Sequence, residues 1–393
     1  MRRTFVLRVL TAYALCRIFS VVLLTIVSRY QAPVTWTGPH PDYFSMTVLW
    51  DGFWYRQIAE VGYPAALPID AVTGAVHENA WAFYPAFPMM ARGLMAVTGL
   101  AFPVAGSTLA LVLGFGAAVV MGLLLRDRVG PKVALAAVAV FAALPVSPSL
   151  QIAYTESLAL LLLCTALLLL RNRRYSWLIP VLVTLALTRA VALAFVPVLV
   201  VHGISRWRGR SVEPFPVPDR WRVVGLACLA VAVTGLWPTI AAITTRDPTA
   251  YTQTMSSWGG TTGKLRVLTE FPVFAWAQGG AVGLAGLICI IGLTAWLVLR
   301  SGARAWGPEV RAWAGFYPLY LLLATAPGSS NIRHLLLAFP LMWPFPEEAT
   351  SASDRRARVA MAAILAVCGL VTQWVWISQF LVVTGPPGGR PFP

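Results

Sequence analysis

Charged residues are scarce in this chain of 393 residues: Asp, Glu, Lys and Arg together make up 11% of it, whereas 58% is hydrophobic. Soluble domains carry about a quarter charged residues, so the composition excludes an ordinary soluble protein. Apolar runs of about 20 residues recur along the whole sequence, and each is long enough to cross a bilayer core as a helix. We therefore expect an all-α, polytopic integral membrane protein that forms a single domain over residues 1–393.

Lysine is nearly missing, with residues only at positions 132 and 264, so the basic side chains are almost all arginine. The net charge of +15 does not indicate a nucleic-acid partner, because the basic residues form short clusters between apolar runs, the pattern that sets membrane topology. The spacing of the five cysteines matches neither a disulfide framework nor a zinc site. Since they lie inside apolar runs, at positions 16, 164, 228, 289 and 368, we expect them to be buried small hydrophobic residues.

The apolar runs predict eleven membrane-spanning helices with the N-terminus in the cytoplasm. They are expected near residues 5–27, 104–125, 133–149, 156–170, 176–188, 190–201, 223–244, 276–299, 313–326, 334–347 and 359–383. This arrangement places most of the basic residues in the inner loops, as the positive-inside rule requires. The same rule divides 176–201 into two short spans at Arg189 and makes 81–100 a helix along the outer interface. Residues 385–393 are rich in Pro and Gly and are expected to be a disordered tail.

The first outer loop, residues 28–103, is by far the longest segment outside the predicted spans. It holds five of the fifteen acidic residues, Asp42, Asp51, Glu60, Asp70 and Glu78. Within it, 49–62 predicts a helix whose apolar side chains share one face at helical spacing. We expect that face to lie in lipid, with Asp51 near the bilayer surface. An Asp at a membrane is costly unless it pairs, meets water or takes part in chemistry, so this loop is where a functional site is expected.

Two motifs in this loop resemble the PIG-V family, which belongs to the GT-C superfamily of membrane glycosyltransferases. They are Trp50-Asp51-x-x-x-Tyr55-x-x-Ile58-Ala59-x-x-Gly62-Tyr63 and Ala82-Phe83-Tyr84-Pro85-x-x-Pro88. Weaker traces are Ser147-Pro148, Tyr154-Thr155-Glu156, Thr188-Arg189 and Arg333 with the downstream Pro340. The chain departs from the family at Arg189-Ala190-Val191-Ala192, where family members often carry Arg-x-Asn-Gly.

The resemblance implies a GT-C fold of about eleven transmembrane helices with interfacial helices in the first extracytoplasmic loop. It also implies a mannosyltransferase that uses a polyprenyl-phosphate mannose donor and inverts the anomeric centre to give an α-mannoside. The acceptor is expected to be an extracytoplasmic glycolipid or glycan, and the site to face outward from the cell membrane. The compact chain resembles a bacterial, actinobacterial-type relative more than the eukaryotic enzyme of GPI-anchor assembly.

Asp51 is the expected general base, because an inverting displacement needs a group that takes the proton of the attacking hydroxyl. It is also placed to cap the helix that follows it. Arg333 and His334 follow a Gly-Ser-Ser-Asn loop at the start of a span, which favours anion binding. Arg189 needs a partner inside the membrane, and both Glu156 and the donor phosphate qualify. The donor phosphate is therefore assigned to Arg333, His334 and Arg189.

The acceptor or sugar is assigned to the remaining polar and aromatic residues at the outer side: His77, Glu78, Trp81, Tyr84, Tyr55, Tyr154 and Glu156. No cofactor or metal is expected, because a single His-Glu pair offers too few ligands and arginines can neutralise a lipid-linked phosphate. Two other functions remain open. One is a GT-C enzyme that uses another polyprenyl-phosphate sugar. The other is a transporter or flippase of lipid-linked sugars, although the chain shows no internal repeat.

Overall fold

The computed structural model describes residues 2–34, 36–259, 266–342 and 351–384, and within these ranges the secondary structure is helical without a named strand. The α-helices are α1 (Arg2–Val27), α2 (Tyr43–Met46), α3 (Asp51–Glu60), α4 (Ala86–Thr98), α5 (Phe102–Ala143), α6 (Glu156–Arg171), α7 (Tyr175–Ala186), α8 (Val196–Arg208), α9 (Val217–Thr234), α10 (Leu236–Thr245), α11 (Ala250–Ser257), α12 (Arg266–Leu299), α13 (Pro308–Ala324), α14 (Ser330–His334) and α15 (Ala352–Trp376). Short 3-10 segments are η1 (Ser28–Tyr30), η2 (Ala80–Ala82), η3 (Ser147–Leu150), η4 (Leu193–Phe195), η5 (Ser301–Trp306) and η6 (Leu335–Met342), and η7 (Ile377–Leu381) is a π-helix.

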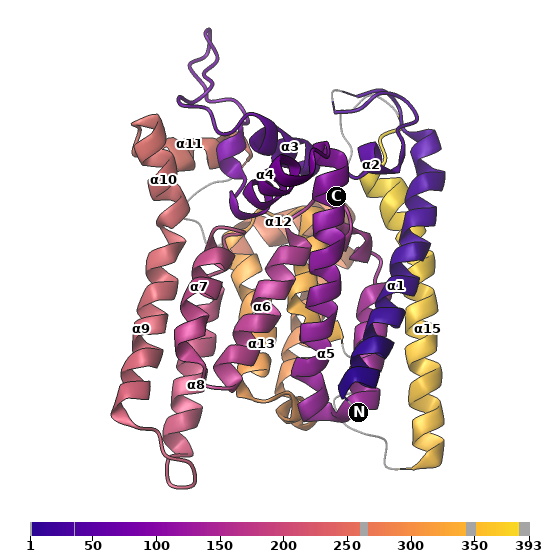
Figure 1. The fold of residues 1–393 in the computed structure, drawn as a ribbon, viewed down its shortest axis with the longest axis vertical. Coiled ribbons are helices and arrows are strands. Elements are labelled where there is room, and N and C mark those ends of the chain that lie inside the picture. Colours follow the sequence, from indigo (N-terminus) through magenta and orange to yellow (C-terminus); the bar gives the residue numbers. More distant parts are fainter. Residues whose placement is uncertain (1, 35, 260–265, 343–350, 385–393) are drawn as a thin grey trace.

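The long helices stand side by side in a bundle, and short helices α3, α4 and α11 lie over one end of it (Figure 1). We call this the capped end. The N-terminus lies at the opposite end (Figure 1). A bundle closed at one end by short helices can hold a site between the cap and the ends of the long helices, where several chain segments meet.

Five helical segments among the described residues are long and apolar enough to cross a membrane. They are Arg2–Tyr30, Phe102–Ala143, Val217–Thr245, Leu268–Leu299 and Ala352–Leu381. The chain is therefore a multi-pass membrane protein, while the total of eleven spans stays a prediction. The predicted span 334–347 coincides over its first part with η6, and residues 343–347 lie outside the described residues, as does the predicted tail 385–393.

Helix α5 turns sharply at Gly130, where φ is 78° and the helical geometry is interrupted. Its first limb lies antiparallel to α1, since Gly122 packs on Val9 and Gly114 on Tyr13. The second limb returns toward the capped end, where Arg17 of α1 donates a hydrogen bond to the carbonyl of Ala142 at 2.6 Å. Only glycine adopts this left-handed backbone at no steric cost, so Gly130 separates the two segments that the sequence predicts as 104–125 and 133–149.

The chain also breaks where the sequence predicts it to, between α7 and α8. Helix α7 ends at Ala186 and α8 begins at Val196, so residues 187–195 form a non-α connection that contains Arg189 and η4. The connection starts against the cap, because the backbone N–H of Ala86, at the start of α4, donates to the Leu187 carbonyl at 2.9 Å.

The predicted helix 49–62 forms as α3, but the prediction that its apolar face lies in lipid is wrong. Trp50 and Ile58 are buried in the protein, and Val61 is 80% exposed. The edge of the Tyr55 ring packs on Phe87 of α4 at 5.7 Å between ring centroids. An apolar face can be buried against either lipid or protein, and in this structure α4 and α5 cover the apolar face of α3. The cysteines differ from expectation for a related reason: Cys228, Cys289 and Cys368 are exposed, because α9, α12 and α15 turn those faces outward.

Candidate active site

A cavity of about 370 Å³ lies beneath the cap, bounded by α3, the loop at 188–191, α11, α13 and α14. Aromatic side chains make up much of its wall: Tyr55, Phe83, Tyr84, Tyr251, Trp258, Tyr317 and Tyr320. The ionisable non-tyrosine side chains on the wall are Asp51, Arg189 and His334. A concave site with many aromatic groups and a few convergent polar ones is the usual form of a small-molecule site.

Asp51 is the first residue of α3, and its carboxylate reaches across to α14. Arg333 Nη2 donates to Asp51 Oδ2 at 2.6 Å, with 4% of the arginine side chain and 31% of the aspartate side chain exposed. The N-cap position belongs to Trp50, and no side chain caps the helix there. The prediction that Asp51 also caps the helix is therefore wrong, because its carboxylate turns toward Arg333.

Trp50 holds an uncommon backbone conformation, with φ at 56° and ψ at −117°, directly before Asp51. Such a conformation in a bulky residue costs on the order of 1–3 kcal/mol and persists only where the surroundings enforce it. Its indole nitrogen donates to the Leu381 carbonyl at 2.8 Å, and its ring packs on Trp36 at 4.6 Å. These contacts fix the start of α3 and hence the position of the Asp51 carboxylate.

Glu156 links the two arginines of the site. Its Oε1 accepts from Arg189 Nη1 at 2.5 Å and lies 3.4 Å from Arg333 Nε. The Glu156 side chain is 1% exposed, at the first position of α6. Burial lowers the pKa of Arg333, because it disfavours the charged guanidinium. The negative charges of Asp51 and Glu156 have the larger combined effect, so the pKa of Arg333 lies above its ordinary value. Two carboxylates and two guanidiniums thus form one charge-balanced network, and Glu156 is the Arg189 partner that the sequence allowed.

Tyr154 lies under the network and does not reach the cavity. The Arg333 guanidinium carbon lies 4.6 Å from the centre of the Tyr154 ring, a cation–π contact. The Tyr154 hydroxyl donates to the Leu49 carbonyl at 3.0 Å. Among the described residues of this network, Arg333 Nε, Arg333 Nη1 and Glu156 Oε2 are buried and have no hydrogen-bond partner. Two arginine donors and one carboxylate acceptor therefore remain without a hydrogen bond behind the cavity wall.

The structure brings together most, but not all, of the residues that the sequence singled out. Asp51, Tyr55, Tyr84, Arg189 and His334 line the cavity. Arg333, Tyr154 and Glu156 lie directly behind them and hold them in place.

His77, Glu78 and Trp81 do not line the cavity. His77 and Glu78 are exposed, and His77 Nε2 lies 3.6 Å from Asp70 Oδ2 in a surface turn closed by the Ile69–Val76 bridge. Trp81 is 1% exposed and stacks on Tyr63, at 4.7 Å between ring centroids. All three residues are close to Tyr84 in the sequence. His77 and Glu78 nevertheless lie in a surface turn away from the cavity, and Trp81 is enclosed by other aromatic side chains.

Several cavity residues were not predicted from the sequence, notably Tyr251, Tyr317, Tyr320 and Asn331. The hydroxyl oxygens of Tyr251 and Tyr84 lie 3.0 Å apart. Burial, and to a smaller extent the contact with Tyr251, raises the pKa of Tyr84 well above its ordinary value. Tyr320 donates to the Ala190 carbonyl in the break beside Arg189. The i, i+3 spacing of Tyr317 and Tyr320 was the one available signal, since it places both on one face of a helix.

Within the described ranges, no three His, Cys, Asp or Glu side chains lie close enough together to hold a metal ion. The charged side chains that face the cavity are Asp51 and Arg189, and Glu156 and Arg333 complete their network behind the wall.

No protein-family model matches the sequence. No curated protein matches it either. Among solved structures, the chain is similar to the crystal structure of an oligosaccharyltransferase from Archaeoglobus fulgidus in complex with Zn and sulfate, with a TM-score of 0.50 and 14% identity. The likeness covers 96% of this chain. The chain therefore shares the helical fold of the matching part of that enzyme. It spans 54% of the length of that oligosaccharyltransferase, so the likeness concerns about half of the larger enzyme. At this identity the likeness shows the fold, and the PIG-V and bacterial relationships remain predictions from the sequence.

Proposed function

We propose that the chain is a membrane glycosyltransferase that moves mannose from polyprenyl-phosphate mannose to an acceptor hydroxyl with inversion, and that Asp51 is its general base. The observation that carries this proposal is the position of Asp51, partly exposed in an aromatic cavity and hydrogen-bonded to a buried arginine. The fold shared with the oligosaccharyltransferase from Archaeoglobus fulgidus and the resemblance of the Trp50–Tyr63 segment to the PIG-V family support it.

The arrangement suits an inverting displacement. Arg333 occupies Asp51 Oδ2 and orients the carboxylate, which leaves Oδ1 to accept the proton of the acceptor hydroxyl. As that oxygen bonds to the anomeric carbon, the bond from this carbon to the phosphate oxygen breaks, and the electron pair leaves with the polyprenyl phosphate. The proton passes to Asp51, so the step is balanced without a further reactant.

Arg189 and His334 line the cavity. They are proposed to bind the phosphate of the donor substrate together with Arg333, which lies behind them. Charge-assisted hydrogen bonds from guanidinium groups match phosphate oxygens well. Glu156 contacts both arginines and so keeps them oriented. Tyr55 and Tyr84 present rings and hydroxyls to the cavity, where a sugar is expected to lie. The capped end is proposed to face the extracytoplasmic side, where the glycolipid or glycan acceptor arrives.

Transfer of radiolabelled mannose from polyprenyl-phosphate mannose to membrane acceptors tests this function. Wild type and Asp51→Asn are compared in detergent, with Asp127→Asn as the matched control. Asp127 is an exposed acid that pairs with Arg171 and does not line the cavity. Transfer by wild type and by the control, together with its loss in a folded Asp51→Asn protein, is the expected result. Equal transfer by all three proteins removes Asp51 from the chemistry. Transfer only from polyprenyl-phosphate glucose or arabinose keeps the enzyme class and overturns the choice of mannose.

A further inference from the structure

A second hollow lies on the opposite side of α11 from the cavity. It has a volume of about 680 Å³ and runs between α11 and the loop at Gly74–Val76. The α11 side of this groove carries Thr249, Thr252, Gln253, Ser256 and Ser257. All of these side chains are polar and uncharged, which sets the groove apart from the aromatic and charged cavity.

The hydrogen bonds of these side chains leave acceptors, rather than donors, for a ligand. The hydroxyl of Thr252 donates to the Thr249 carbonyl at 2.8 Å, and that of Ser256 to the Thr252 carbonyl at 2.9 Å. The Gln253 amide nitrogen donates to Asp247 at 3.0 Å and to the Thr249 hydroxyl at 2.6 Å. A hydroxyl that donates keeps lone pairs that accept. The groove thus matches a neutral ligand rich in hydroxyl donors, and it offers no cation to an anionic one.

Helix α11 is the wall shared by the groove and the cavity. Its residues Tyr251 and Met255 line the cavity, whereas Thr252 and Ser256, one position further on, line the groove. The helix is held in place from the first outer loop, because Asn79 Nδ2 donates to the buried Thr254 hydroxyl at 3.1 Å. A ligand in the groove is therefore separated from the site of Asp51 by the thickness of one anchored helix.

We propose that this groove binds a neutral sugar unit of the acceptor, so that the acceptor is a glycan of several residues whose end enters the Asp51 cavity. This inference rests on the proposed glycosyltransferase function. A glycan longer than the cavity needs a second contact outside it, and a row of acceptor oxygens facing a backbone loop suits sugar hydroxyls.

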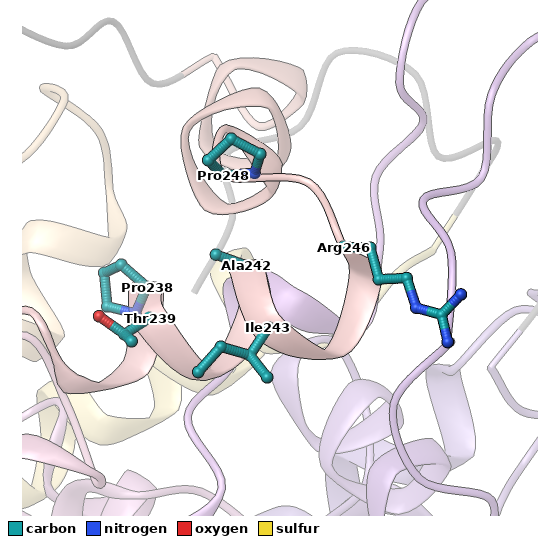
Figure 2. A pocket seen from close by; sticks show the side chains of 6 residues that line it. All are labelled: Pro238, Thr239, Ala242, Ile243, Arg246 and Pro248. Carbon is teal, nitrogen blue, oxygen red and sulfur yellow. The ribbon is translucent and has the colours of Figure 1, made fainter.

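A third hollow, on α10, provides the comparison. It has a volume of about 440 Å³ and is lined by Pro238, Thr239, Ala242, Ile243, Arg246 and Pro248 (Figure 2). Prolines and aliphatic side chains dominate this lining, and Ile243 is 73% exposed. Thr239 is the threonine of this hollow, and it is exposed on α10. Thr239→Val is therefore a control of the same kind as Thr252→Val, at a position that does not line the groove.

Titration calorimetry tests the groove. It measures the binding of mannotetraose and of maltotetraose to the purified full-length protein in detergent. Wild type and Thr239→Val are expected to bind at least one tetrasaccharide with the same Kd, and Thr252→Val/Ser256→Ala to bind it about tenfold more weakly, the effect of losing one or two hydrogen bonds. Thr252 and Ser256 are exposed, so the variant is expected to keep the wild-type melting temperature. No saturable binding by wild type, or an equal Kd in the groove variant, overturns the proposal.

The same protein preparations separate this proposal from the function on which it rests. Asp51→Asn is expected to bind the tetrasaccharide like wild type while transfer is lost. Binding that depends on Thr252 and Ser256 without any transfer by wild type overturns the transferase function and leaves the glycan groove standing. Transfer by wild type without dependence of Kd on these residues overturns the groove alone.

Discussion

Asp51 Oδ2 and Arg333 Nη2 lie 2.6 Å apart although 282 positions separate the two residues in the chain. The pair joins the cap to the end of the bundle, because Asp51 starts α3 and Arg333 belongs to α14. It connects the proposed base to the buried network that includes Glu156 and Arg189. The geometry of the proposed base and that of the proposed phosphate site therefore depend on each other.

Replacing Asp51 with Asn is expected to lower the rate of mannosyl transfer by about 10²–10⁴-fold, the usual contribution of a positioned base. Asn keeps the size of the side chain and can still accept from Arg333, so the fold is expected to survive. Initial rates of labelled product, normalised to folded protein by gel filtration, give the measurement. A decrease of less than about threefold contradicts the role of Asp51 as base.

Replacing Arg333 with Met is expected to destabilise the protein by about 3–5 kcal/mol, because two buried or partly buried carboxylates lose a partner. The loss is expected to be smaller when Asp51→Asn is already present, since one of those carboxylates is then gone. A double-mutant cycle on unfolding free energy measures the coupling. Strictly additive losses contradict a direct Asp51–Arg333 interaction.

Replacing Gln373 with Leu is expected to destabilise the capped end of the bundle by about 1–3 kcal/mol, the cost of leaving buried polar groups unpaired. Gln373 accepts from the Ser20 hydroxyl at 2.8 Å and donates to the Ser147 hydroxyl at 3.1 Å. Arg17 donates to the same Ser147 hydroxyl at 2.7 Å. Thermal unfolding of the purified variant checks this, with Thr372→Val as control, because Thr372 bonds only within its own helix. Equal melting temperatures for both variants contradict the network.

Replacing Gly369 with Ala is expected to cost about 1–3 kcal/mol through overpacking between α15 and α5. A Cβ at this position lies 2.5 Å from the backbone oxygen of Ala143, which cannot move aside as a flexible side chain can. Gly286→Ala on α12 is the control, because nothing lies within 4 Å of its Cβ position. A melting temperature for Gly369→Ala at or above that of the control contradicts the close packing of α15 on α5.

Cysteine labelling is expected to place the capped end outside the cell membrane. Val72 and Val212 are 95% and 91% exposed. Val72 belongs to the loop between α3 and η2 and Val212 to the loop between α8 and α9, and these two loops lie at opposite ends of the bundle (Figure 1). In a variant without the native cysteines, Val72→Cys is expected to react in intact cells with a membrane-impermeant maleimide, and Val212→Cys only after lysis. The reverse pattern contradicts a cytoplasmic N-terminus.

The sequence alone determined the membrane class, and it singled out Asp51 in the loop 28–103, which the structure places in the cavity wall. These follow from local properties: hydropathy over a helix length, charge clusters, and an acid among aromatic residues beside a membrane. The break at Arg189 was also predicted, and Glu156 was one of the two partners that the sequence offered, because a membrane arginine needs an anion.

The tertiary structure alone decided which surfaces these residues share. The apolar face of α3 could have met lipid or protein, and its packing on α4 and α5 settled that choice. His77 and Glu78 left the site because a surface turn carries them outward, whereas Tyr251, Tyr317 and Tyr320 entered it from helices far along the chain. Periodicity describes which residues share a face, but only the packing of helices distant in sequence determines what that face touches.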